Sequence, residues 1–93
     1  MTNLIIFHEV KDGNKWASAW KKGPGSRHEM FAKIGVKTRT FRDPNNPNLT
    51  GVFAEVPDMK KFDDLLSSPE GQKAMSDDGL KPETMKVLAE FTS

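Results

Sequence analysis

Short runs of apolar and alternating residues predict four β-strands along the chain. Residues 4–10 are rich in Ile and Phe, which is typical of a strand that is buried on both faces. Residues 36–42 and 49–56 alternate between polar and apolar positions, as strands with one exposed face do. Residues 84–91 form the last run of this kind. The four runs together predict a four-stranded sheet.

Two segments with apolar residues at helical spacing lie between these strands. In the first, Asp12 is placed to cap a helix that carries Trp16 and Trp20 on one face. The Gly-Pro-Gly sequence at residues 23–25 interrupts this helix. A second helical piece restarts at Ser26, which begins an S-x-x-E capping box. We therefore predict that the first helical region is one broken element.

The second helical region has the same broken form. Asp58 is placed to cap its first piece. Ser68 followed by Pro69 predicts a restart, because proline suits the first position of a helix. Between the two helical regions, the dense turn residues at 43–48 predict a hairpin whose loop is long and stiff.

The order of these elements is strand, broken helix, strand, strand, broken helix and strand. This βαββαβ order predicts an α+β protein of the ferredoxin-like class, with a four-stranded antiparallel sheet and the helices on one face. A chain of 93 residues is long enough for one domain, residues 1–93, and too short for two.

Alternation along the strands assigns residues to the two faces of the sheet. Leu4, Ile6, His8 and Val10 share one face, which we expect to meet the helices. The opposite face would be bare in a single chain, and a bare face with aromatic residues is usually covered by a second subunit, so we expect a homodimer. The charged residues of that face could line an inter-subunit barrel, where like charges raise carboxylate pKa values, but pairing with Arg39 or simple exposure at the barrel edge is favoured. The residues assigned to it are Phe7, Glu9, Arg39, Phe41, Phe53, Glu55, Leu88 and Glu90.

The charge balance of the chain argues against nucleic acid and membrane partners. Fourteen Lys and Arg residues against thirteen Asp and Glu residues give a net charge of +1, without the basic excess that nucleic-acid binding needs. The apolar run near the N-terminus is too short to span a bilayer and lacks the basic flank of a signal peptide, so we expect a cytoplasmic protein. The lack of cysteine excludes disulfides and thiolate metal sites.

Several short motifs, spread over most of the chain, resemble those of the dimeric α+β-barrel superfamily, which includes antibiotic-biosynthesis-monooxygenase-like proteins. More narrowly, the chain is similar to the small cyclase-like members. The resemblance implies the fold and a homodimer, and its members include cofactor-independent monooxygenases, polyketide cyclases, lactone isomerases and haem-handling proteins. The chain has no Tyr, which cyclase-type relatives often use as an acid or base. The motifs are His8-x-Val10-x-Asp12-x-x-x-Trp16, Ile34-Gly35-Val36, Phe41-Arg42-Asp43-Pro44-Asn45-Asn46-Pro47-Asn48, Pro57-Asp58 and Leu66-x-Ser68-Pro69-Glu70.

His8 is the best candidate for a catalytic residue, because the strand pattern places its polar ring where an apolar side chain is expected. An imidazole with a pKa near its ordinary value of about 6.5 could act as a general acid or base at neutral pH. The alternative is a structural His that is hydrogen-bonded to the backbone or to a helix. The candidates for ligand binding around it are Trp16, Trp20, Phe31, Val52 and Ala54. The alternative for the helical stripe that contains Trp16, Trp20 and Phe31 is that it forms the core, which is the more common role of such a stripe.

The second histidine, His28, lies beside the cap of the restarted helix, where we expect a solvent-facing side chain. Neither histidine has flanking cysteines or an H-x-x-x-H spacing, so we expect no metal site and no cofactor. A haem with His8 or His28 as axial ligand stays open on the resemblance alone.

Three functions therefore remain open, and the sequence does not decide whether the protein is an enzyme. The first is a homodimer that binds a small hydrophobic or aromatic molecule and acts as a cofactor-independent cyclase, isomerase or monooxygenase. The second is a non-catalytic binding or stress-response module whose pocket is filled by side chains. The third is a haem-handling protein. A cavity on the order of a few hundred Å³ beside His8 would favour ligand binding over the filled module.

Overall fold

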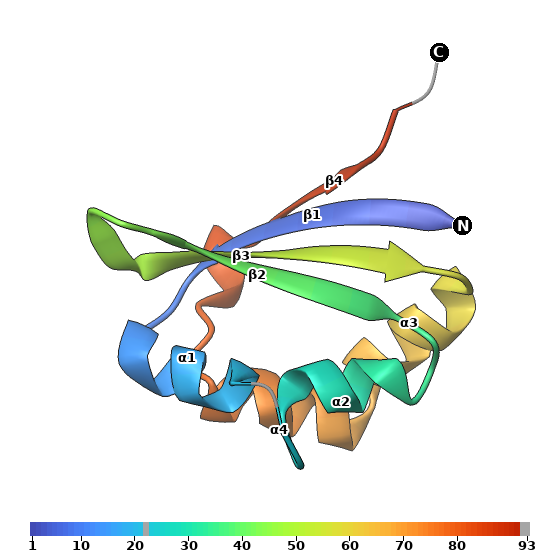
Figure 1. The fold of residues 1–93 in the computed structure, drawn as a ribbon, viewed down its shortest axis with the longest axis horizontal. Helices are drawn as coiled ribbons and strands as arrows, with labels where there is room; N and C mark the ends of the chain where they lie inside the picture. The colour runs from blue at the N-terminus through green and yellow to red at the C-terminus, as the bar shows by residue number, and fades with distance from the viewer. Residues whose placement is uncertain (22, 92–93) are drawn as a thin grey trace.

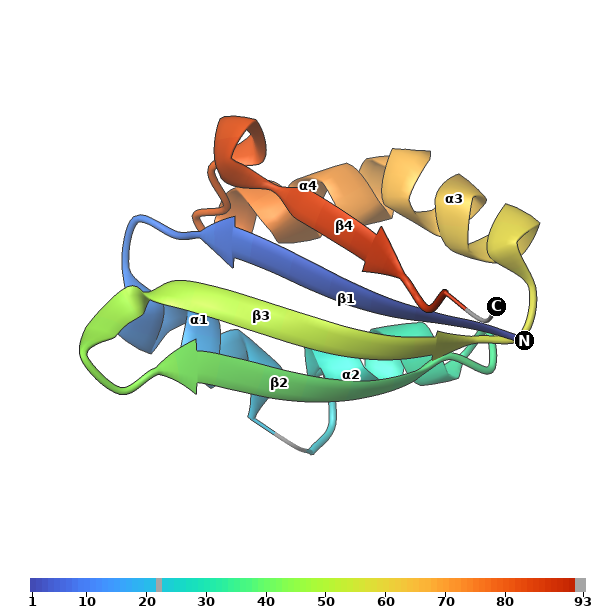
Figure 2. The same ribbon diagram turned by 90° about the horizontal axis from the view of Figure 1, so that it is seen from above.

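The protein consists of a four-stranded antiparallel sheet with all of its helices on one side. This computed structural model describes residues 1–21 and 23–91. The strands lie in the order β2-β3-β1-β4, and every neighbouring pair is antiparallel (Figure 2). The predicted ferredoxin-like α+β class is therefore confirmed. The strands are β1 (Thr2–Glu9), β2 (Lys37–Asp43), β3 (Asn46–Val56) and β4 (Lys86–Ala89).

Both helical regions are broken in two, as the sequence predicts. The four α-helices cover one face of the sheet and leave the other face uncovered (Figure 1). A short 3₁₀ helix, η1, precedes β4. The helices are α1 (Gly13–Trp20), α2 (Arg27–Ala32), α3 (Met59–Ser67), α4 (Pro69–Asp77) and η1 (Pro82–Thr84).

The predicted capping residues begin the helices. Asp12 accepts hydrogen bonds from the backbone N–H groups of Asn14 and Lys15 at 3.0 and 3.3 Å. Ser68 has two roles, since its hydroxyl oxygen accepts from the N–H of Gly71 at 3.1 Å and its O–H donates to the carbonyl of Leu65 at 2.6 Å. One side chain therefore both ends α3 and begins α4.

The connection between β2 and β3 differs from the predicted long loop. Asp43 pairs with Asn46, so the turn contains only residues 44–45. The pairing of β2 with β3 shifts register between Arg42 and Asp43, so residues 47–49 of β3 have no partner in β2. Nε of Arg42 donates to the carbonyl of Pro47 in this stretch at 2.9 Å. A side chain bonded to the bulged backbone thus lets turn-forming residues continue as a strand.

The predicted strand at residues 84–91 is shorter than expected, because Thr84 ends η1 and its O–H donates to the carbonyl of Lys81 at 2.6 Å. In the single chain, strand β1 is buried on its inner face, and Ile5 and Phe7 on its outer face are 40% and 42% exposed. Burial of β1 on both faces therefore stays a prediction that depends on the expected dimer.

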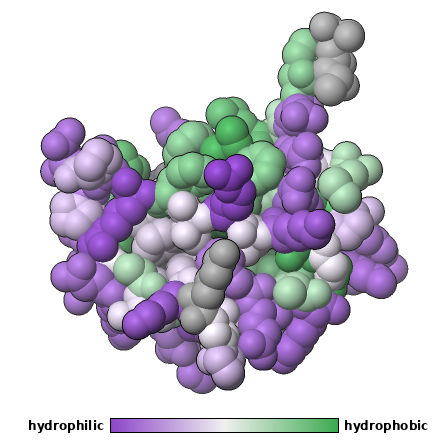
Figure 3. Space-filling view, viewed as in Figure 1, coloured by the Kyte–Doolittle hydropathy of each residue, from purple (hydrophilic) through white to green (hydrophobic). Residues whose placement is uncertain are grey.

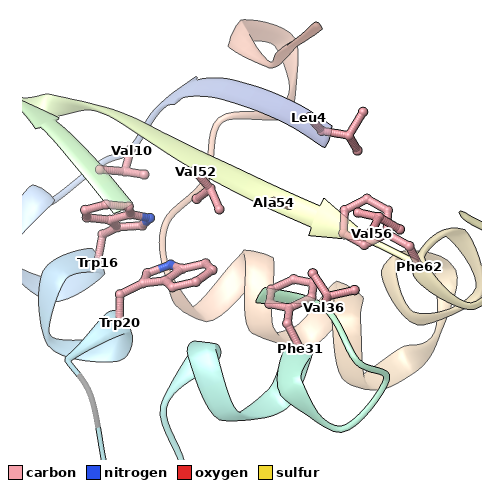
Figure 4. Close-up of a cluster of buried hydrophobic side chains, with 10 residues drawn as sticks. All are labelled: Leu4, Val10, Trp16, Trp20, Phe31, Val36, Val52, Ala54, Val56 and Phe62. Atoms are coloured by element: carbon pink, nitrogen blue, oxygen red, sulfur yellow. The ribbon is translucent and has the colours of Figure 1, made fainter. Parts of the chain in front are cut away.

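The hydrophobic core lies between the sheet and the helices (Figure 4). Trp16 and Trp20 reach it from α1, and Phe31 and Phe62 reach it from α2 and α3. The other core residues in the close-up are Leu4, Val10, Val36, Val52, Ala54 and Val56, which come from the strands and their flanking segments. Among the described residues, no helix is long and apolar enough to cross a membrane.

The outer face of the sheet carries the aromatic residues that the alternation assigned to it. Ile5 pairs with Phe53 on one side and with Leu88 on the other, so their side chains share this face. Phe7 and Phe41 both lie opposite Gly51, and Phe41 is 53% exposed. The space-filling view shows apolar side chains gathered at the top of the molecule, over the sheet and on the side away from the helices (Figure 3). We call this set, Ile5, Phe7, Phe41, Phe53 and Leu88, the outer patch.

Candidate ligand-binding site

A cavity of about 220 Å³ lies between the inner face of the sheet and the helices. All four strands and helices α1 to α4 contribute to its walls, and most of the lining side chains are apolar. All six candidate residues line this one space: His8, Trp16, Trp20, Phe31, Val52 and Ala54. The fold therefore brings together residues that are spread over 47 positions of the sequence, from 8 to 54.

Aromatic rings form one wall of the cavity. Trp16 and Trp20 are one helical turn apart, which puts both indoles on the same face of α1, with their ring centroids 6.2 Å apart. The Trp20 ring stacks on Phe31 at 5.8 Å with an interplanar angle of 13°. Phe31 in turn lies 5.9 Å from Phe62 (Figure 4). Such a row of rings suits a flat apolar ligand.

His8 is the polar residue of β1 that points into this apolar space. Its side chain lies edge-on to Trp16, with the ring centroids 6.1 Å apart, and the residue is only 5% exposed. Neither Nδ1 nor Nε2 has a hydrogen-bond partner among the described residues. Within the described residues, His8 is therefore not held by a hydrogen bond to the backbone or to a helix, which was the structural alternative. Two buried polar atoms remain available for a ligand.

The surroundings of His8 control its charge. Burial lowers the pKa of His8 from 6.5 to about 4, and the negative charge of Asp78 opposes part of this effect. The ring is therefore neutral at pH 7. In a neutral imidazole one nitrogen donates a hydrogen bond and the other accepts one, so His8 can bind either a hydroxyl or a carbonyl group.

An ion pair between Arg27 and Asp78 also lines the cavity, and sequence reasoning missed it. Nε and Nη2 of Arg27 donate to the Asp78 carboxylate at 2.9 to 3.2 Å. Asp78 is 7% exposed and follows the end of α4, whereas Arg27 begins α2. The two residues are 51 positions apart, and each lies at the end of a helix. No short-range pattern could have joined them.

Methionines make up another part of the lining that was not predicted. Four of the five methionines of the chain contact the cavity, and each is half-buried. Methionine is unbranched and flexible, so walls of this kind can adapt to ligands of different shape. The four residues are Met30, Met59, Met75 and Met85.

The remaining titratable candidates lie elsewhere. His28 is half-buried rather than solvent-facing, because its ring packs edge-on against Trp20 at 5.0 Å and its Nδ1 lies 2.6 Å from the hydroxyl of Thr38. The charged residues predicted for the outer face lie there by register, away from the cavity: Glu9, Arg39, Glu55 and Glu90. Within residues 1–21 and 23–91, no group of three or more His, Asp or Glu side chains could hold a metal ion.

Comparison with known proteins gives relatives by structure only. No protein-family model and no curated protein sequence matches the chain. A crystal structure of an antibiotic biosynthesis monooxygenase matches 100% of this chain and 99% of its own, with a TM-score of 0.72 and 12% identity. The fold is that of the antibiotic biosynthesis monooxygenases.

Two other structures agree with this assignment of the fold. A provisional antibiotic biosynthesis monooxygenase from Nitrosomonas europaea has a TM-score of 0.70 at 12% identity, over 99% of this chain and 98% of that one. A provisional monooxygenase from Lactobacillus acidophilus has a TM-score of 0.66 at 18% identity, over 95% of this chain and 42% of that one. At these identities the likeness to antibiotic biosynthesis monooxygenases concerns the fold, and the site must be argued from this chain's own residues.

Proposed function

We propose that the protein binds one small aromatic or other hydrophobic molecule in the cavity, with His8 as its polar anchor. The observation that supports this is a single buried histidine, both of whose ring nitrogens are unpartnered among the described residues, in a cavity of otherwise mostly apolar walls. Binding sites of this kind combine apolar lining with a few well-placed polar groups.

The volume of the cavity limits the size of the ligand. A closed apolar cavity of about 150 Å³ holds benzene, and drug-sized ligands occupy about 300–1,000 Å³. A volume of about 220 Å³ falls between these ranges. A molecule with one or two rings fits best, and the adaptable methionines allow some variation in its shape.

The chemistry available to such a ligand is acid–base chemistry at His8. The neutral ring can accept a proton from a hydroxyl group or donate a hydrogen bond to a carbonyl oxygen. A single acid–base residue of this kind could support cyclisation, isomerisation or oxygenation without a cofactor. Oxygenation is favoured among these reactions because the solved structures that share the fold are named as monooxygenases.

The two other functions have less support. In a non-catalytic module with a filled pocket, side chains would occupy the space that here measures about 220 Å³. A haem is at least as large as the smallest drug-sized ligands, which need about 300 Å³, so a cavity of about 220 Å³ does not favour a haem-handling role.

Tryptophan fluorescence can test the binding proposal directly, because both tryptophans of the chain line the cavity. We expect p-xylene and p-cresol to change the emission in a saturable way. Ala54→Leu adds bulk inside the cavity and should abolish the change, whereas Ala32→Leu, on the exposed end of α2, should preserve it. Equal responses from both variants would refute binding in this cavity.

The role of His8 is tested by the two probes, which differ only in a methyl and a hydroxyl group. In His8→Leu, a buried hydroxyl would lose its partner, at a cost of about 1–3 kcal/mol. The affinity for p-cresol should therefore fall by about tenfold or more relative to that for p-xylene. An unchanged ratio of the two affinities would show that His8 does not anchor the ligand.

We also propose that the protein is a homodimer formed through the outer patch. The exposed fractions of Phe41 and Leu88, 53% and 58%, support this, as do the commonly dimeric relatives of the fold. Phe7→Glu should produce a monomer in analytical ultracentrifugation, whereas Ala32→Glu on the helical side should not. A parent protein that sediments as a monomer would contradict the proposal.

A further inference from the structure

Three charged side chains line the cavity among the described residues, and two of them form a fixed unit. Asp63 on α3 is exposed to solvent. Arg27 and Asp78 instead form a largely buried pair with three N–H···O contacts at 2.9 to 3.2 Å. Burying a carboxylate costs free energy unless the carboxylate is paired. Arg27 therefore allows Asp78 to stay charged in the cavity wall.

Asp78 is the charged group that acts on His8. The elements around the ring offer few other charged groups. Helix α1 contributes only the uncharged side chains of Trp16 and Trp20 to the cavity lining, and the strands contribute no further ionisable group to it. The carboxylate of Asp78 raises the pKa of His8 against the effect of burial. His8 and Asp78 line the same cavity, and a buried carboxylate in such a space stabilises the positive charge that an imidazole acquires when it accepts a proton.

We propose that Asp78, fixed by Arg27, is a positioning residue that stabilises the protonated form of His8 when this ring takes a proton from a bound ligand. The inference rests on the proposed function. In the step, the ligand's O–H bond breaks, an N–H bond forms on His8, and the electron pair stays on the ligand oxygen. Arg27 and Asp78 cancel each other's charge, so the new cation on His8 balances the new anion on the ligand.

The ligand class follows from this charge balance. The site suits an uncharged molecule with an acidic hydroxyl group, because a ring whose pKa is about 4 takes a proton readily only from a relatively strong acid. A ligand that arrives as an anion would bring a charge that the pair of Arg27 and Asp78, already neutral as a unit, does not compensate. The coloured anion of 4-nitrophenol makes the step visible in a spectrometer.

The first experiment needs no ligand. The protonation of His8 is followed by NMR as a function of pH in the parent, in Asp78→Asn and in Asp77→Asn. Asp77 is the matched control, since it is the neighbouring residue and pairs with Lys73 at 2.8 Å on the surface. We expect Asp78→Asn to lower the pKa of His8 by roughly one unit and Asp77→Asn to leave it unchanged. An equal pKa in all three proteins would overturn the proposal.

The second experiment follows proton transfer in the complex. 4-Nitrophenol is added below the pH at which it ionises in water, and the absorption of its anion is measured in the bound state. The parent and Asp77→Asn should show the same anion fraction, and Arg27→Met/Asp78→Leu, which leaves no unpaired Arg27 cation to attract the anion, a smaller one. The same fraction in all three proteins would overturn the proposal.

A double variant separates this role from a structural one. Arg27→Met/Asp78→Leu removes both charges, and apolar replacements of a buried pair often preserve folding. It should lower the pKa of His8 by less than Asp78→Asn does, because no unpaired Arg27 cation remains, and it should also lower the anion fraction; parental values would refute the proposal even if Asp78→Asn alone does not fold. If no aromatic probe binds to the parent, the proposed function fails. If probes bind but the variants change neither readout, only this inference fails.

Discussion

The depressed pKa of His8 makes a quantitative prediction about stability and pH. The folded protein holds this ring neutral down to a pKa of about 4, whereas in the unfolded chain it titrates near its ordinary value of 6.5. Between these two values the unfolded state binds more protons, so the free energy of unfolding rises with pH through this window. The stability from the neutral ring is therefore complete above pH 6.5 and is lost as the pH falls toward 4.

The size of the effect follows from the width of the window. Each unit of pKa difference corresponds to about 1.4 kcal/mol, so the full shift is worth about 3 kcal/mol. At pH 5 about 2 kcal/mol of this should already be lost relative to pH 7. For a small domain this loss lowers the urea midpoint by roughly 1–2 M.

The assay compares the parent with His8→Leu in urea at pH 7 and at pH 5. Leu restores the apolar pattern of the inner face of β1 and cannot titrate, while His28 and all carboxylates stay the same in both proteins. The variant should be at least as stable as the parent at pH 7, and its advantage should grow by about 2 kcal/mol at pH 5. Parallel pH dependence in the two proteins would refute the reasoning, because it would mean that His8 titrates normally.

Two further predictions concern the junction of α3 and α4. Ser68→Ala removes both the cap of α4 and the bond to the carbonyl of Leu65, so urea unfolding should show a loss of about 1–2 kcal/mol, against less than about 0.5 kcal/mol for Ser67→Ala on the exposed side. At Gly71 a Cβ would collide with that same carbonyl oxygen, so Gly71→Ala should lower the melting temperature clearly, whereas exposed Ser76→Ala in the same helix should not. An alanine at 71 that leaves the melting temperature unchanged would contradict the close approach of the two helices.

Local patterns predicted what depends on local geometry. The period-two alternation of β1 placed His8 on the same face as Leu4 and Ile6, and the register with β3 confirms it. Caps such as Asp12 were also predictable, because a cap contacts residues only two or three positions away.

The errors arose where distant residues decide the outcome. The long loop predicted at residues 43–48 is a tight turn because Arg42 bonds both to Pro47 and, at 2.9 Å, to the side chain of Asn14 in α1. The pairing of Arg27 with Asp78 depends on how α2 and α4 pack, and no alternation or spacing encodes that packing. Sequence reasoning therefore found the apolar walls of the site and missed its ion pair.

The cavity and the histidine within it mark the place where this chain departs from the pattern of a well-filled core. A domain of this length is stable by only about 5–14 kcal/mol, so an unpartnered buried imidazole, at about 1–3 kcal/mol, takes a large share. The chain could remove this cost by placing Leu at position 8, as the alternation of β1 would suggest. A ligand that fills the cavity and bonds to His8 would recover the lost contacts and would stabilise the fold in proportion to its concentration. The feature that weakens the isolated domain is thus the same one that would hold the proposed ligand.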